Sequence, residues 1–147
     1  AAEDLTSVSK DTVWYANTAQ AGAITLPDAT SSNVGMMITI IVGTTDWSTT
    51  AFKLGFANSG TCVLVGQILL SAADGDATDA TAGFVITANA QSLEIDANDA
   101  TAAGGSIGSK YVFTYLEENL VHCMAYGVCT TGTPAPDASS STTTGTS

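Results

Sequence analysis

The sequence breaks into short apolar runs of strand length, and almost none of them repeats with the period of an amphipathic helix. Thr, Val, Ile and aromatic residues fill the runs, while Gly, Asn, Asp and Pro separate them. β-Branched and aromatic residues favour strands, whereas the separating residues favour turns. The pattern predicts an all-β fold of about eight to ten short strands, an antiparallel β-sandwich or jelly-roll-like module with extended termini.

The expected strands cover residues 5–8, 12–16, 24–26, 36–42, 51–56, 61–70, 83–88, 92–96, 110–116 and 120–128. Residues 36–42 are apolar on both alternating sides, which predicts a central strand buried on both faces, or a strand with one face against a partner. Residues 117–119 read as a hairpin loop in which Asn119 takes the left-handed conformation. Residues 58–60 indicate another hairpin turn, and Gly66 inside its run indicates a β-bulge.

With 147 residues, the chain has the length of one domain. We expect an N-terminal arm at 1–11, a β-sandwich domain at 12–129 and a Thr/Ser/Pro-rich C-terminal extension at 130–147. The extension has almost no apolar area to bury, so we expect another chain to hold it in place. Pro134 and Pro136 are therefore candidate interface residues.

The charge balance excludes several classes of partner. Lys and Arg together number 3, all lysines, against 14 Asp and Glu, which gives a formal net charge of −11. Nucleic-acid backbones are bound by clusters of basic residues, and an anionic membrane would repel this chain. No run approaches the ~20 apolar residues of a membrane span. We therefore expect neither nucleic acid nor a membrane as partner.

The residues that could carry catalysis are few. A Ser/His/Asp or Cys/His site would need His122, the single histidine, which precedes Cys123 in a predicted strand. Adjacent strand residues point to opposite faces, so these two cannot pair as base and nucleophile. A tetrahedral zinc site needs four ligands, and the chain has only three cysteines and one histidine, with Cys62 far from the other three in sequence. We therefore interpret Cys62, Cys123 and Cys129 as reduced thiols in the core. We expect no enzymatic activity and no cofactor.

Two further features are candidate binding sites, one for a cation and one for a protein partner. Asp74, Asp76 and Asp79 crowd carboxylates into one segment, which reads as a solvated acidic loop or as a weak calcium or sodium site, although the spacing departs from that of an EF-hand. Trp47 lies in a polar loop, where it could join the core or insert into an interface.

Three stretches carry a resemblance to a known group of proteins. They are residues 22–29 (GAITLPDA), 34–42 (VGMMITIIV) and 108–115 (GSKYVFTY). This succession of a Pro-terminated strand, a Gly-led apolar strand and a late aromatic strand resembles small virion surface proteins of tailed bacteriophages. The Trp that many of those proteins have in their final strand is absent from residues 120–124. The resemblance implies a β-sandwich or jelly-roll-like module, often trimeric, without catalytic residues.

The resulting expectation is a structural virion protein, a capsid decoration or cement protein that binds and stabilises the outer capsid surface. Its partners would be the major capsid protein and further copies of itself, with a trimer favoured. It would be made in the host cytoplasm and end on the virion surface. The alternatives are a carbohydrate- or receptor-binding β module, such as a fibre tip or adhesin, and a subunit of an extracellular filament with the C-terminal extension as donor strand.

Overall fold

The computed structural model describes residues 3–17, 23–45, 47, 52–56, 61–72, 82–86, 90, 92–95, 104–129 and 139–141. Within these ranges the chain forms strands in two sheets and no helix, so the predicted all-β class is confirmed. In this described part, accordingly, no helix is long and apolar enough to cross a membrane.

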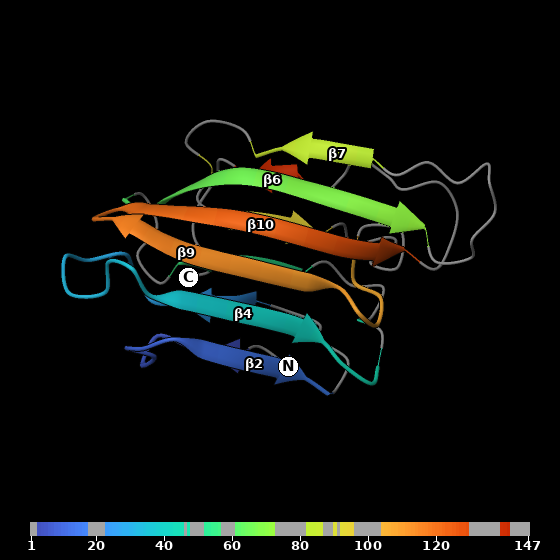
Figure 1. Ribbon diagram of the computed structural model, residues 1–147, viewed down its shortest axis with the longest axis horizontal. Helices are drawn as coiled ribbons and strands as arrows, with labels where there is room; N and C mark the ends of the chain where they lie inside the picture. The colour runs from blue at the N-terminus through green and yellow to red at the C-terminus, as the bar shows by residue number, and fades with distance from the viewer. Residues whose placement is uncertain are drawn as a thin grey trace.

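One sheet has six strands and faces the viewer in Figure 1. Its order across the sheet is β2 (Thr12–Ala16), β4 (Met37–Val42), β9 (Lys110–Glu117), β10 (Leu120–Cys129), β6 (Val63–Ala72) and β7 (Ala82–Val85). The second sheet lies behind it and has five strands. Its order is β1 (Glu3–Asp4), β3 (Ala23–Leu26), β5 (Phe52–Phe56), β8 (Ser92–Ile95) and β11 (Ser139–Ser141).

Both sheets are mixed, so the expectation of a purely antiparallel arrangement is wrong. β2 pairs in parallel with β4, and β10 with β6; in the other sheet β1, β3 and β5 are parallel neighbours. The remaining pairs are antiparallel. The cause is that the chain changes sheet after each of its first five strands. Strands that return to the same sheet after such a crossing run in the same direction.

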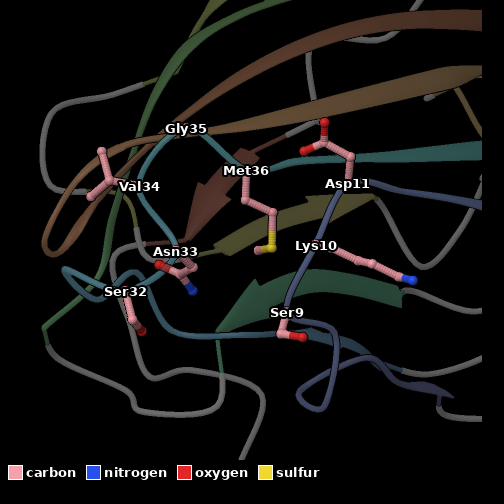
Figure 2. Close-up of a pocket in the computed structure, with 8 residues that line it drawn as sticks. All are labelled: Ser9, Lys10, Asp11, Ser32, Asn33, Val34, Gly35 and Met36. Carbon is pink, nitrogen blue, oxygen red and sulfur yellow. The ribbon is translucent and has the colours of Figure 1, made fainter.

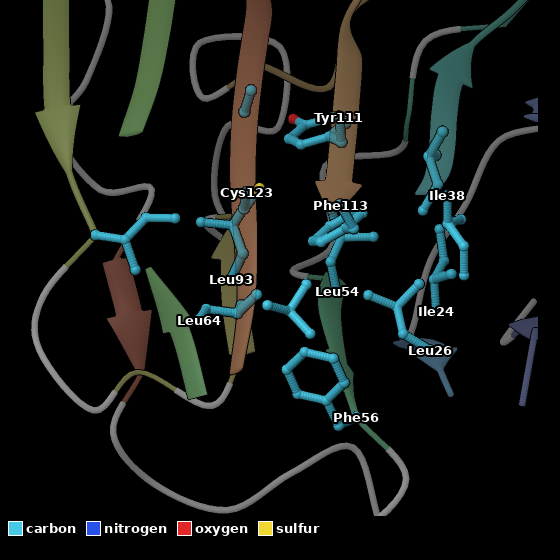
Figure 3. Close-up of a cluster of buried hydrophobic side chains, with 14 of the residues drawn as sticks. Ile24, Leu26, Ile38, Leu54, Phe56, Leu64, Leu93, Tyr111, Phe113 and Cys123 are labelled. Carbon is cyan, nitrogen blue, oxygen red and sulfur yellow. The ribbon is translucent and has the colours of Figure 1, made fainter. Parts of the chain in front are cut away.

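The core lies between the two sheets. Side chains from both point toward one another in Figure 3, with Phe113 and Ile38 from one sheet and Leu54, Phe56 and Leu26 from the other. Strand alternation produces this layer, because every second residue of β4 and β9 is buried while its neighbours are not. The run 36–42 is thus buried on one face only, and Met37 on its other face is exposed.

The predicted hairpin between β9 and β10 forms, but Glu117 belongs to β9 and pairs with Leu120, so the loop is 118–119 and not 117–119. Asn119 has a φ of 64°, the left-handed conformation expected for it. The turn expected at 58–60 lies outside the described residues, but β5 and β6 on either side of it belong to different sheets and form no hairpin with each other. β6 and β10 pair without a register shift through Gly66, so no bulge forms on that side of β6.

Both ends of the chain join the five-stranded sheet. The expected strand at 5–8 is wrong, because β1 lies earlier, at Glu3–Asp4, and pairs with β3. The Leu5 amide donates to the Thr25 carbonyl at 2.8 Å, and the Leu5 side chain is buried. The described part of the expected arm is therefore attached to its own domain. In the extension, β11 pairs with β8 of the same chain.

That last pairing shows that three residues of the extension are held by their own chain. An edge strand is held by backbone hydrogen bonds, which need no apolar side chain. Residues 139–141 obtain those bonds from their own sheet.

Candidate interaction surface

The predicted site residues divide into those the structure describes and those it does not. Asp74, Asp76 and Asp79 lie outside the described residues, as do Pro134 and Pro136. Among the described residues, no group of His, Cys, Asp and Glu is arranged to hold a metal ion. Trp47 is described, and its side chain is only 1% exposed. Two roles were predicted for Trp47, packing in the core or insertion into an interface. The structure places its side chain in the core, so the side chain is not available for insertion into a partner.

His122 and Cys123 lie on opposite sides of β10. Cys123 is fully buried in the core, whereas His122 is half-buried on the other face. Burial raises the pKa of the Cys123 thiol to about 12, because desolvation disfavours the thiolate. The thiol is therefore protonated at neutral pH, which is the state of a packing residue and not of a nucleophile.

Cys62 also has a structural contact. Its Sγ accepts a hydrogen bond from the Ala29 amide at 3.1 Å, and burial raises its pKa. Two residues before Ala29, the Pro27 carbonyl accepts a 2.8 Å hydrogen bond from the buried Tyr115 hydroxyl. These contacts fasten the loop after β3 to β9 and the start of β6. Both described thiols, Cys62 and Cys123, are unbridged.

A shallow trough lies beside this loop, between Ser9–Asp11 and the turn at 32–36, with a volume of about 430 Å³ (Figure 2). Its polar groups are largely occupied within the chain. Asp11 Oδ1 accepts a hydrogen bond from the Met37 amide at 2.8 Å. The Asn33 side chain accepts one from the Thr30 amide and donates one to the Asp28 carbonyl, each at 2.8 Å.

A second hollow of about 390 Å³ adjoins the first and shares Ser9, Ser32 and Asn33 with it. Of the lining residues that the structure describes in either hollow, none is aromatic. Sugar rings are commonly held by stacking on an aromatic face, and the described lining offers none. Its geometry therefore gives the carbohydrate-binding alternative no support.

Exposed hydrophobic side chains gather on the side of the six-stranded sheet that faces away from the core, called here the outer face. Figure 1 looks directly onto it. Of the nine large hydrophobic side chains that are exposed among the described residues, seven come from the strands of this sheet and two, Val34 and Ile107, come from loops. The seven are Val13, Tyr15, Met37, Leu69, Val85, Leu116 and Tyr126.

The strand registers arrange these side chains in rows across the sheet. One row crosses all six strands and contains Val13, Thr39, Val112, Met124, Gln67 and Val85. The next contains Tyr15, Ile41, Lys110, Tyr126 and Leu69. At the two edges, Val13 is 68% exposed and Val85 is 79% exposed. The outer face is therefore largely apolar, and its polar side chains are Thr39, Gln67 and Lys110 in these two rows and the pair Thr114 and His122 in the row beside them.

The outer face is also almost without charge. The sequences of the six strands contain two charged residues, Lys110 and Glu117, and Glu117 is the last residue of β9, at the hairpin. This contrasts with a chain of formal net charge −11. Continuous apolar surface without charge is typical of regions that another surface covers.

The comparisons with known proteins yield no relative: no protein-family model, no curated protein and no solved structure matches this chain. A function for the chain must therefore be inferred from its fold and its surface chemistry.

Part of the outer face follows the sequence-based expectation, because the run 36–42 was expected either to be buried on both faces or to have one face against a partner. The extent of the face across the other strands was not predicted. In β4 and β9 the positions that alternate with the core include Met37, Ile41, Val112 and Leu116, where an ordinary solvated face would carry charged residues.

Proposed function

We propose that this protein is a non-enzymatic structural component of a virion surface, a decoration or cement protein of the capsid. The single observation that carries the proposal is the outer face. Such a surface is stable in water when another surface covers it, so the chain is suited to work inside an assembly.

The remaining chemistry supports the same role. The chain carries 14 acidic residues against 3 basic ones, which keeps particles apart from each other and from nucleic acid. The thiols of Cys62 and Cys123 are buried and unbridged, and burial raises the pKa of each, so neither of these two is a reactive surface thiol. The partners in this proposal are the major capsid protein and further copies of the chain, and many copies on one lattice would add avidity.

The fold proposal is finer than the two mixed sheets described above. We propose that the module is a β-sandwich related to the jelly-roll-like domains of phage virion proteins, as the resemblance of residues 22–29, 34–42 and 108–115 implies. The alternating use of the two sheets by β1 to β6 is the feature that such a relative would have to share.

The alternatives fit less well. A fibre tip that binds sugar needs an aromatic platform in a hollow, but Tyr15 and Tyr126 lie on a flat sheet and Trp47 lies in the core. A filament subunit that donates its extension needs that extension free, whereas β11 pairs with its own β8.

The test is to find where the protein resides. Antibodies against the recombinant full chain are applied to particles from a lysate of cells that carry the gene, after a density gradient. We expect the chain to sediment with the particles and immunogold to decorate the shell. Label confined to fibre tips would replace the proposal with the adhesin alternative. A chain that stays at the top of the gradient in every lysate, while particles form normally, would overturn it.

A further inference from the structure

We propose that the outer face of the six-stranded sheet packs against the same face of a second copy of this chain, forming a two-fold, sheet-on-sheet dimer. The inference rests on the proposed assembly role and names the partner that covers the surface.

The charge distribution favours a second copy. Two chains of formal net charge −11 repel each other, and they approach most easily through surfaces without carboxylates. The described strand residues of the outer face meet that condition, since Glu117, the one acidic residue in these strands, alternates with them at the hairpin end of β9. A nucleic acid or an anionic membrane would need several cations, and Lys110 is the one lysine in these strands.

The chemistry of the rows is self-complementary. Strands β9 and β10 are the middle strands of the sheet, so its centre lies near the cross-strand pair Val112 and Met124. A two-fold axis there would bring the row from Val13 to Val85 of one copy onto the same row of the other. Lys110 begins β9, in the neighbouring row, and its long side chain can carry its ammonium group to the rim.

The available area is adequate. Each strand residue covers about 3.3 Å along the strand and about 4.8 Å across it, so the six strands together span roughly 700 Å² of sheet. A stable protein interface buries about 800 Å² on each partner, and faces of two sheets pack closely about 10 Å apart. Homodimer interfaces are also the more apolar class, which matches this surface.

The test measures the oligomeric state of the full chain by sedimentation velocity over a range of concentrations. We expect a species of twice the monomer mass of 14.8 kDa. Tyr126→Asp places a carboxylate on the outer face at a residue that is 48% exposed, so the monomer should still fold. It should weaken the dimer by at least about tenfold, because the contact would lose the apolar ring of Tyr126 in both copies and would have to desolvate the new carboxylate together with Lys110, its cross-strand partner.

Val34→Asp is the matched control. Val34 is 51% exposed but lies in a turn off the sheet, so the same chemical change there should leave the dimer intact. A wild-type chain that is monomeric up to about 100 μM would overturn the inference, since interfaces of this size normally associate below that concentration. A trimer, or a dimer unaffected by Tyr126→Asp, would also overturn it.

A measurement on the wild-type protein covers the case in which Tyr126→Asp does not fold. Hydroxyl-radical footprinting should show Tyr15, Met37 and Tyr126 becoming protected as concentration rises, while Ile107 stays reactive throughout. Protection of the same residues at every concentration, with a monomeric mass, would overturn the dimer and mean that part of the same chain covers the face. Either failure leaves the particle-sedimentation result, and with it the proposed function, unaffected.

Discussion

Trp47 stacks on Tyr111, with the ring centroids 5.8 Å apart and the ring planes 13° from parallel. The same two residues fasten one loop. The Trp47 amide donates to the Gly105 carbonyl at 2.8 Å, and the Tyr111 hydroxyl donates to the Gly104 carbonyl at 2.7 Å. A tryptophan from a polar segment after β4 thus closes the core beside β9.

Replacing Trp47 tests whether this residue belongs to the core or to an interface. We expect Trp47→Ala to lower the free energy of unfolding by about 3–5 kcal/mol, the usual effect of removing a large buried aromatic ring. Tyr111→Phe should lower it by about 1 kcal/mol through loss of one hydrogen bond. Urea denaturation measures both. If Trp47→Ala left the stability of the monomer unchanged, the interface role would be favoured over the core role.

Gly66 occupies a position that tolerates no side chain. Its φ is +131°, and a Cβ there would lie 2.0 Å from the carbonyl oxygen of Cys123 on β10. We expect Gly66→Ala to destabilise the fold by about 3 kcal/mol or more, by separating β6 from β10. Gly83→Ala is the control, because its Cβ would meet only Leu69 Cδ2 at 3.3 Å. Thermal unfolding should show a much smaller change for the control, and equal losses would contradict this account.

Alkaline pH should destabilise the protein. Burial raises the pKa of Cys123 from 9.0 to about 12, and it also raises the pKa values of Cys62 and Tyr115. When the pH lies between the pKa of such a group in the unfolded chain and its pKa in the folded chain, the unfolded chain binds fewer protons. The free energy of unfolding therefore falls as pH rises from about 9 toward 12. Urea titrations along this range measure the slope. Cys123→Ala should be less stable at pH 7 but have a shallower slope; an identical slope would exclude Cys123 as a cause.

Asn119 should tolerate glycine but not a β-branched residue. Its φ is 64°, and its backbone accepts from the Val63 amide at 2.9 Å and donates to the Ala29 carbonyl at 3.0 Å. We expect Asn119→Gly to change the free energy of unfolding by less than about 0.5 kcal/mol. Asn119→Val should lower it by about 1–2 kcal/mol, because the left-handed conformation crowds a branched side chain. Chemical denaturation distinguishes the two, and equal effects would contradict the conformational explanation.

Removing residues 130–147 should leave a cooperative fold, because β11, the described part of the extension, is a three-residue strand at the edge of its sheet. The loss uncovers the β8 edge, and exposed edges pair with other chains. We expect near-native circular dichroism together with faster aggregation, followed by light scattering. A truncated chain that fails to fold would place the extension in the core.

The sequence by itself determined where most of the strands lie, although not β1 or β11. Residues 12–16 form the expected strand, and the strand expected at 110–116 is β9, which extends one residue further. Asn119 closes the expected hairpin. These are local properties, because side-chain alternation and turn chemistry depend on a few neighbouring residues.

Only the tertiary structure decided how those strands pair. A turn residue reverses the chain, but it does not specify whether the next strand joins the previous one or crosses to the opposite sheet. For that reason the parallel pairs, the separation of β5 from β6 and the attachment of β11 to β8 could not be predicted. Trp47 entered the core, and the apolar residues from Val13 to Val85 merged into one face, because distant strands were brought into register.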